Sequence, residues 1–240
     1  MHSLPREAAL EGRFEYIKDN YNRLVEDIAS RSDKVGRKVT LLPVTKSGSD
    51  EELVALCRLG VLAIGENRPQ ELKRRGELLR SLGISVELHE IGNLQKNKVR
   101  QIIDTVSLIH SLDSVELARE IQKRAETTGR DIPVLIEINS AREEGKSGIL
   151  PEEAERLVEA LYELPRLKLS GLMTMGPVCQ DSEDIRPYFT LTRKLFEEFG
   201  EKYGYYGEGI LSMGMSDSYR VAIEEGSTLV RVGSMLFRKV

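Results

Sequence analysis

Lys46 is the residue whose type and position most directly suggest chemistry. It ends the apolar, β-branched run 39–46 and is followed by Ser47-Gly48-Ser49, small residues that favour a turn. A run of that length predicts a buried strand with the lysine at its carboxyl end, where parallel α/β folds place their active sites. A desolvated lysine amine loses its charge and attacks an aldehyde to form a Schiff base. Considered alone, the residue is better explained as a lysine that extends into solvent from a strand end.

The segment 211–218 is the second chemical feature, because it ends a predicted strand and begins a predicted helix. Small residues such as Gly214 and Ser216 let backbone N–H groups approach an anion, and the amino end of a helix carries partial positive charge. Gly233 and Ser234 follow the next predicted strand. Taken singly, Ser216 is explained as a helix cap and Gly233 as a tight turn. Together, the loops after the seventh and eighth strands of a barrel indicate a site for a phosphate ester.

Arg231 lies within the apolar run Leu229-Val230-Arg231-Val232, and a buried guanidinium requires a partner. A structural ion pair is one such partner. The other is a ligand heteroatom. An arginine donates to an unprotonated pyridine nitrogen and leaves the ring a weak electron sink, whereas an aspartate keeps that nitrogen protonated.

The remaining polar candidates receive no role from the sequence. His89 and His110 have no spacing typical of metal ligands, and Lys146 is a second amine near the predicted mouth of the fold. Cys57 and Cys179 suggest neither a disulfide framework nor a zinc site. Two short basic runs, 73–75 and 93–100, are typical of solvated helix faces. We therefore assign no catalytic residue and no metal ligand.

The elements that must position these residues alternate between strand-like and helix-like patterns. The strand-like segments are 39–46, 61–65, 86–91, 105–109, 132–139, 167–173, 210–213 and 228–232. Eight such segments predict an α/β fold of the TIM-type (β/α)8 barrel class, with an open doubly wound sheet as the alternative. No linker divides residues 1–240, so a single domain is expected.

An extra amino-terminal helix is predicted over 5–31, where apolar residues recur every three or four positions. Almost no chain follows the last predicted strand to form a closing helix. We therefore expect the amino-terminal helix to cover the seam of the barrel.

Composition excludes several classes of partner. The formal net charge is -4 and the sequence pI is near 5.6, so nothing attracts the chain to nucleic acid or to anionic lipid. No apolar run approaches the thickness of a bilayer, and residues 1–7 lack the basic and apolar segments of a signal peptide. A cytoplasmic protein with no membrane partner is expected.

Several motifs in a fixed order are those of a known family. They are Val44-Thr45-Lys46, Gly65-Glu66-Asn67, Ile91-Gly92-Asn93-Leu94-Gln95, Lys146-Ser147-Gly148, Gly171-Leu172-Met173-Thr174, Ser212-Met213-Gly214-Met215-Ser216 and Arg231-Val232-Gly233-Ser234. On these motifs the chain resembles the pyridoxal phosphate homeostasis proteins, also called alanine-racemase-like amino-terminal-domain proteins. The resemblance implies a single barrel like the cofactor domain of alanine racemase, with pyridoxal 5'-phosphate (PLP) bound as a Schiff base on Lys46.

The same resemblance implies roles for the other cofactor-binding residues. Asn67 would lie near the ring and Arg231 would face the ring nitrogen. The residues implied around the phosphate are Ser212, Gly214, Gly233 and Ser234, with Met213 in the same cofactor-binding loop.

The function implied by the resemblance is that of a cytoplasmic carrier and regulator of PLP, with PLP-dependent apoenzymes as candidate recipients. A PLP-dependent amino-acid racemase and a Schiff-base aldolase acting on a phosphorylated substrate remain as alternatives. Racemisation requires an acid or base on each face of the substrate, and one lysine serves only one face. In alanine racemase the opposing tyrosine comes from a second domain, so we favour the binding protein over the enzyme.

Overall fold

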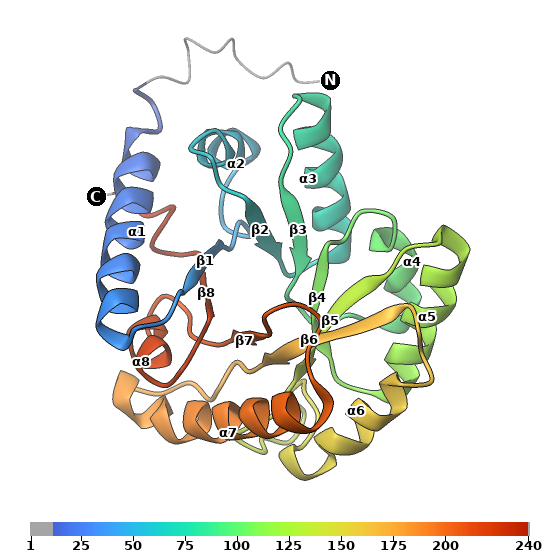
Figure 1. Cartoon of the computed structure of the whole chain (residues 1–240). Helices are drawn as coiled ribbons and strands as arrows, with labels where there is room; N and C mark the ends of the chain where they lie inside the picture. Colours follow the sequence, from blue (N-terminus) through green and yellow to red (C-terminus); the bar gives the residue numbers. More distant parts are fainter. Residues whose placement is uncertain (1–11, 240) are drawn as a thin grey trace.

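A sheet of eight parallel strands forms the centre of the protein in the computed structural model, which describes residues 12–239. Figure 1 shows the strands arranged in a ring with the helices outside it. The strands are β1 (Thr40–Pro43), β2 (Ala63–Glu66), β3 (Glu87–Glu90), β4 (Leu108–Leu112), β5 (Ile132–Glu137), β6 (Leu167–Met173), β7 (Ile210–Ser212) and β8 (Leu229–Val232). All eight predicted strands are confirmed.

The ring closes on both sides of β1. The strand order is β1-β8-β7-β6-β5-β4-β3-β2, and all four residues of β1 pair in parallel with β8. On the other side, Val44 forms a parallel bridge with Gly65, and the Thr45 N–H donates to the Gly65 carbonyl oxygen at 3.1 Å. The predicted barrel is therefore confirmed, and the open doubly wound sheet is wrong.

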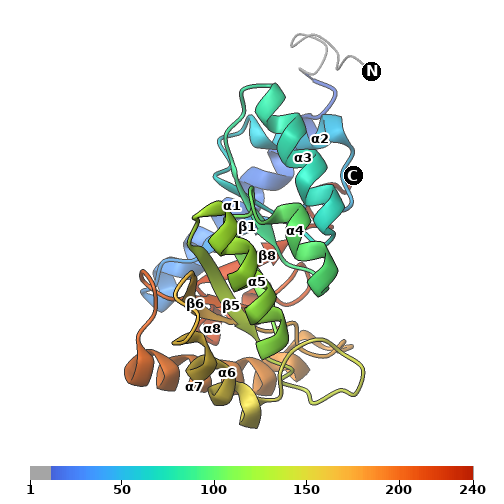
Figure 2. The same cartoon turned by 90° about the vertical axis from the view of Figure 1, so that its right-hand side faces the viewer.

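The helices cover the outer surface of the ring. They are α1 (Glu15–Val35), α2 (Asp50–Cys57), α3 (Pro69–Ser81), α4 (Val99–Ile102), α5 (Val115–Thr128), α6 (Ala154–Leu161), α7 (Arg186–Tyr203) and α8 (Tyr219–Glu224), with short 3₁₀ turns at Lys96–Lys98, Pro151–Glu153 and Ser182–Ile185. Figure 2 shows α4 and α5 lying outside the strands. The main apolar core fills the space between the helices and the strands. Within residues 12–239, no helix has the length and apolar character needed to cross a membrane.

Helix α1 has the position that the sequence predicts. Its apolar stripe is buried at Ile17, Leu24 and Ile28, and it packs against α2 and α8 (Figure 1). The Asn20 side chain donates to the carbonyl oxygens of Leu236 and Arg238, at 3.2 and 2.9 Å. The helix thus covers the seam between β8 and β1. Residues 5–11 of the predicted helix lie outside the described residues.

The inner faces of the strands change from apolar to polar along the chain direction. A small cluster of Leu108, Leu135 and Met173, with Ile210 packed against it, is separate from the main core. Side chains alternate between the two faces of a strand, so the residue two positions further along faces the same way. Three of these next positions are polar and buried, namely His110, Glu137 and Ser212, and Arg231 of β8 is also buried. The barrel interior therefore becomes polar toward the carboxyl ends of the strands.

Candidate functional site

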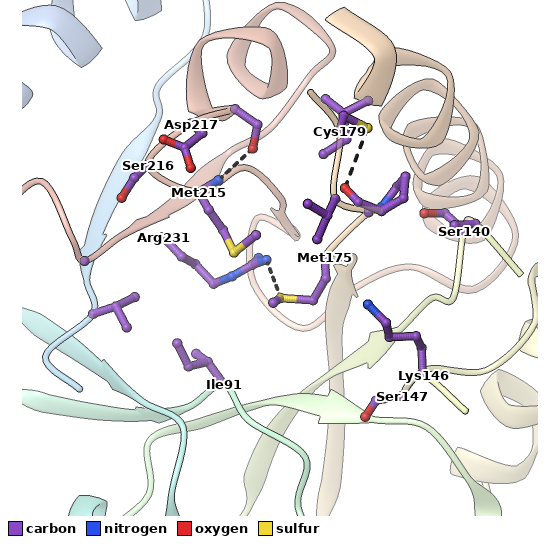
Figure 3. A pocket seen from close by; sticks show the side chains of 18 of the residues that line it. Ile91, Ser140, Lys146, Ser147, Met175, Cys179, Met215, Ser216, Asp217 and Arg231 are labelled. Carbon is purple, nitrogen blue, oxygen red and sulfur yellow. Dashed lines mark hydrogen bonds between the residues drawn. The ribbon is translucent and has the colours of Figure 1, made fainter. Parts of the chain in front are cut away.

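A cavity of about 1300 Å³ opens at the carboxyl ends of the strands. Loops after β1, β2, β3, β5, β6, β7 and β8 contribute to its lining. Figure 3 shows part of this lining, with Ile91, Lys146, Met175, Met215 and Arg231 arranged around the cavity. The predicted site residues that line it are Lys46, Asn67, Arg231, Gly233 and Ser234. These five residues, which come from separate segments of the sequence, therefore lie around one cavity.

The turn that carries Lys46 is fixed on both sides by a buried arginine. Arg75 of α3 donates to the carbonyl oxygens of Thr45 and Gly48, at 2.5 and 2.7 Å. It also donates to the Glu66 carboxylate at 2.7 Å, which accepts a further bond from the Thr45 hydroxyl. Lys46 itself is exposed at the cavity wall. The arginine thus positions the backbone of the lysine while the amine stays accessible.

Arg75 corrects the expectation that the basic run 73–75 forms only a solvated face. Its side chain is 6% exposed and that of Glu66 is 2% exposed. Burial raises the pKa of Glu66 even though the contacts with Thr45 and Arg75 lower it. Desolvation therefore outweighs attraction in this pair, as is common for buried ion pairs. We infer that the pair fixes geometry more than it adds stability.

Arg231 presents a buried guanidinium to the cavity. Its NH1 donates to the Ser212 hydroxyl at 2.7 Å and its NH2 donates to the Thr174 carbonyl oxygen at 3.0 Å. NH2 also lies 3.3 Å from the sulfur of Met175 (Figure 3). Burial lowers the pKa of Arg231 to about 10, against the attraction of Glu137, so the group remains charged at neutral pH.

The contacts of Arg231 decide between the two interpretations of its sequence context. No aspartate or glutamate within residues 12–239 forms an ion pair with it. A buried charge without a carboxylate partner is costly unless its donors are used. The structural ion pair is therefore wrong for the described part of the chain, and the geometry suits an acceptor atom of a ligand.

Glu137 is a cavity residue that the sequence analysis missed. It is buried at the end of β5 and lines the cavity. Burial raises the pKa of Glu137 to about 7, the charge of Asp113 adds to that rise, and Arg231 opposes it. A carboxyl with this pKa exchanges a proton near neutral pH. A charged residue within an apolar run, the signal that singled out Arg231, could have found it.

Three residues of the predicted phosphate loop are buried and do not line the cavity, namely Ser212, Met213 and Gly214. Gly214 has a φ of +92°, and a Cβ there would lie 2.5 Å from the Cβ of Ala222 on α8. Only glycine adopts this turn without strain or collision. These residues shape the loop, and their contact with phosphate remains a prediction.

Residues 215–218 and 233–234 are the parts of the two loops that do face the cavity. The hydroxyl oxygens of Ser216 and Ser234 lie 2.9 Å apart. Gly233 passes so close to the chain after β1 that a Cβ would lie 2.9 Å from the Val44 carbonyl oxygen. Small residues therefore leave a recess with two hydroxyl groups, which fits a phosphate group.

Comparison with known proteins shows the family to which this chain belongs. The profile of the alanine racemase N-terminal domain family matches residues 17–239. A pyridoxal phosphate homeostasis protein of Aquifex aeolicus is 42% identical over 222 residues, which make up 91% of this chain and 96% of the relative. The chain belongs to the pyridoxal phosphate homeostasis protein family. The family member of Escherichia coli K12 is 34% identical over 226 residues, 92% of this chain and 95% of that one.

Solved structures share the fold of this family member. PipY of Synechococcus elongatus, with PLP bound, has a TM-score of 0.80 at 26% identity, covering 92% of this chain and 100% of that chain. An alanine racemase of Clostridium difficile has a TM-score of 0.71 at 20% identity, covering 94% of this chain and 56% of that chain. The predicted family and the barrel of the racemase cofactor domain are confirmed.

Proposed function

We propose that this protein binds PLP and acts in PLP homeostasis, as a carrier that limits the free concentration of a reactive aldehyde. The observation that carries the proposal is the convergence of three groups on one cavity. These are the exposed amine of Lys46, the guanidinium of Arg231, which forms no ion pair within residues 12–239, and the paired hydroxyls of Ser216 and Ser234. Bound PLP supplies an aldehyde, a ring nitrogen and a phosphate ester, one for each group.

Each group has a defined task in this proposal. Lys46 would hold PLP through its amine, because the cofactor supplies an aldehyde with which a lysine amine can form a Schiff base. Arg231 donates a hydrogen bond to the ring nitrogen and so leaves that nitrogen unprotonated. Ser216, Ser234 and Gly233 would surround the phosphate, and Asn67 would lie near the ring.

A carrier fits these residues better than an amino-acid racemase does. The arginine at the ring nitrogen makes the ring a weak electron sink, whereas strong electron withdrawal needs a carboxylic acid. Glu137 is the lining carboxyl that a racemase would require as a second acid or base. Its presence keeps the racemase as the alternative to be tested.

The test is a visible absorption spectrum before and after borohydride, followed by an assay of amino-acid turnover. A carrier gives yellow protein whose colour is lost on reduction, with negligible uptake of solvent deuterium at the α-carbon of alanine. Turnover on the order of one per second or faster contradicts the carrier. If Glu137→Gln abolishes such turnover, the racemase is supported. A protein that stays colourless with added PLP favours the aldolase.

A further inference from the structure

A chain of hydrogen bonds runs from Arg231 through the barrel interior to the first residue of β3. Ser212 Oγ lies 2.7 Å from Arg231 NH1 and 3.1 Å from His110 Nδ1. His110 Nε2 lies 3.1 Å from His89 Nδ1, and His89 Nε2 lies 3.5 Å from Glu87 Oε2. The first four side chains are buried, and that of Glu87 is 68% exposed. The chain therefore links the cavity to solvent near the opposite end of the barrel.

With both histidines neutral, one assignment of protons satisfies every atom of this chain. The Glu87 carboxylate only accepts, so His89 carries its proton on Nε2 and its Nδ1 is an acceptor. His110 must then donate from Nε2 to His89 and accept at Nδ1. The Ser212 hydroxyl donates to that nitrogen, and its oxygen accepts from Arg231.

Electrostatics agrees with a neutral His110 in this assignment. Burial lowers the pKa of His110 well below its ordinary value, and the charge of Arg231 adds to that effect. The contact with His89 also lowers the pKa of Glu87, which remains a carboxylate. All the donors then point from the arginine toward the carboxylate, and hydrogen bonds aligned in one direction polarise one another.

The assignment changes the role of Ser212. A serine hydroxyl has one proton, and here it goes to His110, so none is left to donate to a phosphate. We propose that Ser212, His110 and His89 are positioning residues, which hold the Arg231 guanidinium toward the cavity and connect it to the Glu87 carboxylate. The effect of these residues on cofactor binding rests on the proposed function, whereas the hydrogen-bonded chain is independent of that function.

The first experiment tests the chain of hydrogen bonds in protein without the cofactor. Long-range ¹H–¹⁵N NMR of the full-length, ¹⁵N-labelled protein reports which ring nitrogen of each histidine carries the proton. His110→Gln and His89→Gln assign the signals. We expect His89 and His110 to be neutral and protonated on Nε2 at pH 7. A charged His110, or one protonated on Nδ1, overturns the proposal.

The second experiment tests the effect on Arg231 through PLP binding. Ser212→Ala should weaken PLP affinity about tenfold, since the buried acceptor of the charged Arg231 guanidinium is lost, and should shift the absorption of bound cofactor. The matched control is Ser111→Ala on β4, because the Ser111 hydroxyl is buried and has no hydrogen-bond partner among residues 12–239. Equal affinities and spectra in the two variants overturn the proposal.

A pair of substitutions at His110 separates positioning from simple packing. Gln keeps one donor and one acceptor, whereas Leu keeps neither. We expect His110→Gln to retain PLP affinity and spectrum better than His110→Leu, and equal losses in both variants argue against the proposal. If His110→Leu does not fold, Ser212→Ala and the NMR measurement still decide. If the unmodified protein binds no PLP, the proposed function fails while the NMR result stands.

Discussion

Replacing Arg75 by methionine should destabilise the protein and loosen the turn that carries Lys46. The substitution removes the donor to the carbonyl oxygens of Thr45 and Gly48 and leaves the Glu66 carboxylate buried without its partner. Breaking one side of a buried ion pair costs about 3–5 kcal/mol. Because the lost bonds flank Lys46, we also expect faster release of PLP.

A neighbouring arginine supplies the control for this experiment. Arg74 is also on α3 and contacts Asp50 and Glu71 at 2.7 and 2.9 Å, but its side chain is 45% exposed. Arg74→Met should therefore cost about 1 kcal/mol or less. The double variant Glu66→Gln/Arg75→Met should be more stable than Arg75→Met alone, because no buried charge is left unpaired.

Urea unfolding at pH 7, with and without PLP, measures these differences as free energies of unfolding. A loss for Arg75→Met that equals the loss for Arg74→Met refutes the reasoning. A double variant that is less stable than Arg75→Met also refutes it. If Arg75→Met releases PLP at the rate of the unmodified protein, the ion pair does not position Lys46 for cofactor binding.

Three further predictions concern single residues. Burial raises the pKa of Glu90 from 4.5 to about 8, so the folded state holds an extra proton between these values. The free energy of unfolding should therefore fall from pH 5 to pH 8, and Glu90→Gln should reduce this fall. If urea unfolding shows the same dependence of the free energy of unfolding on pH in both proteins, the prediction is contradicted. Gly214→Ala should cost about 1–3 kcal/mol through backbone strain, and an unchanged urea midpoint would disprove this. Arg231→Ala should weaken PLP binding about tenfold or more, and Arg231→Glu should shift the absorption of bound PLP. Unchanged affinity and spectrum in both would leave Arg231 a structural residue.

The strands were predictable because each is a short apolar run bounded by turn residues, a local signal. The ends of the runs were less predictable. The fourth strand was expected at 105–109 and lies at Leu108–Leu112, because Val106 is apolar and buried but precedes the strand. His110 is therefore inside the barrel rather than at its mouth.

The site was predictable where residues end strands or interrupt apolar runs, as Lys46 and Arg231 do. Arg75 could not be found in this way, since its burial depends on carbonyl groups that only the fold brings close. The contact of Ser212 with His110 joins residues of two strands that are not adjacent in the barrel. Such contacts follow from barrel closure and leave no local signal in the sequence.

The attachment of PLP to Lys46 is the central claim, and peptide mass mapping after borohydride reduction tests it most directly. The protein is incubated with PLP, reduced and digested, beside Lys46→Ala and the control Lys146→Ala, which removes the other lysine of the cavity lining. We predict one phosphopyridoxyl adduct on the Lys46 peptide, present in Lys146→Ala and absent from Lys46→Ala. Lys46→Ala should fold with a free energy of unfolding within about 0.5 kcal/mol of the unmodified protein, because its side chain is exposed. An adduct that persists in a folded Lys46→Ala, or that maps to Lys146, contradicts the account.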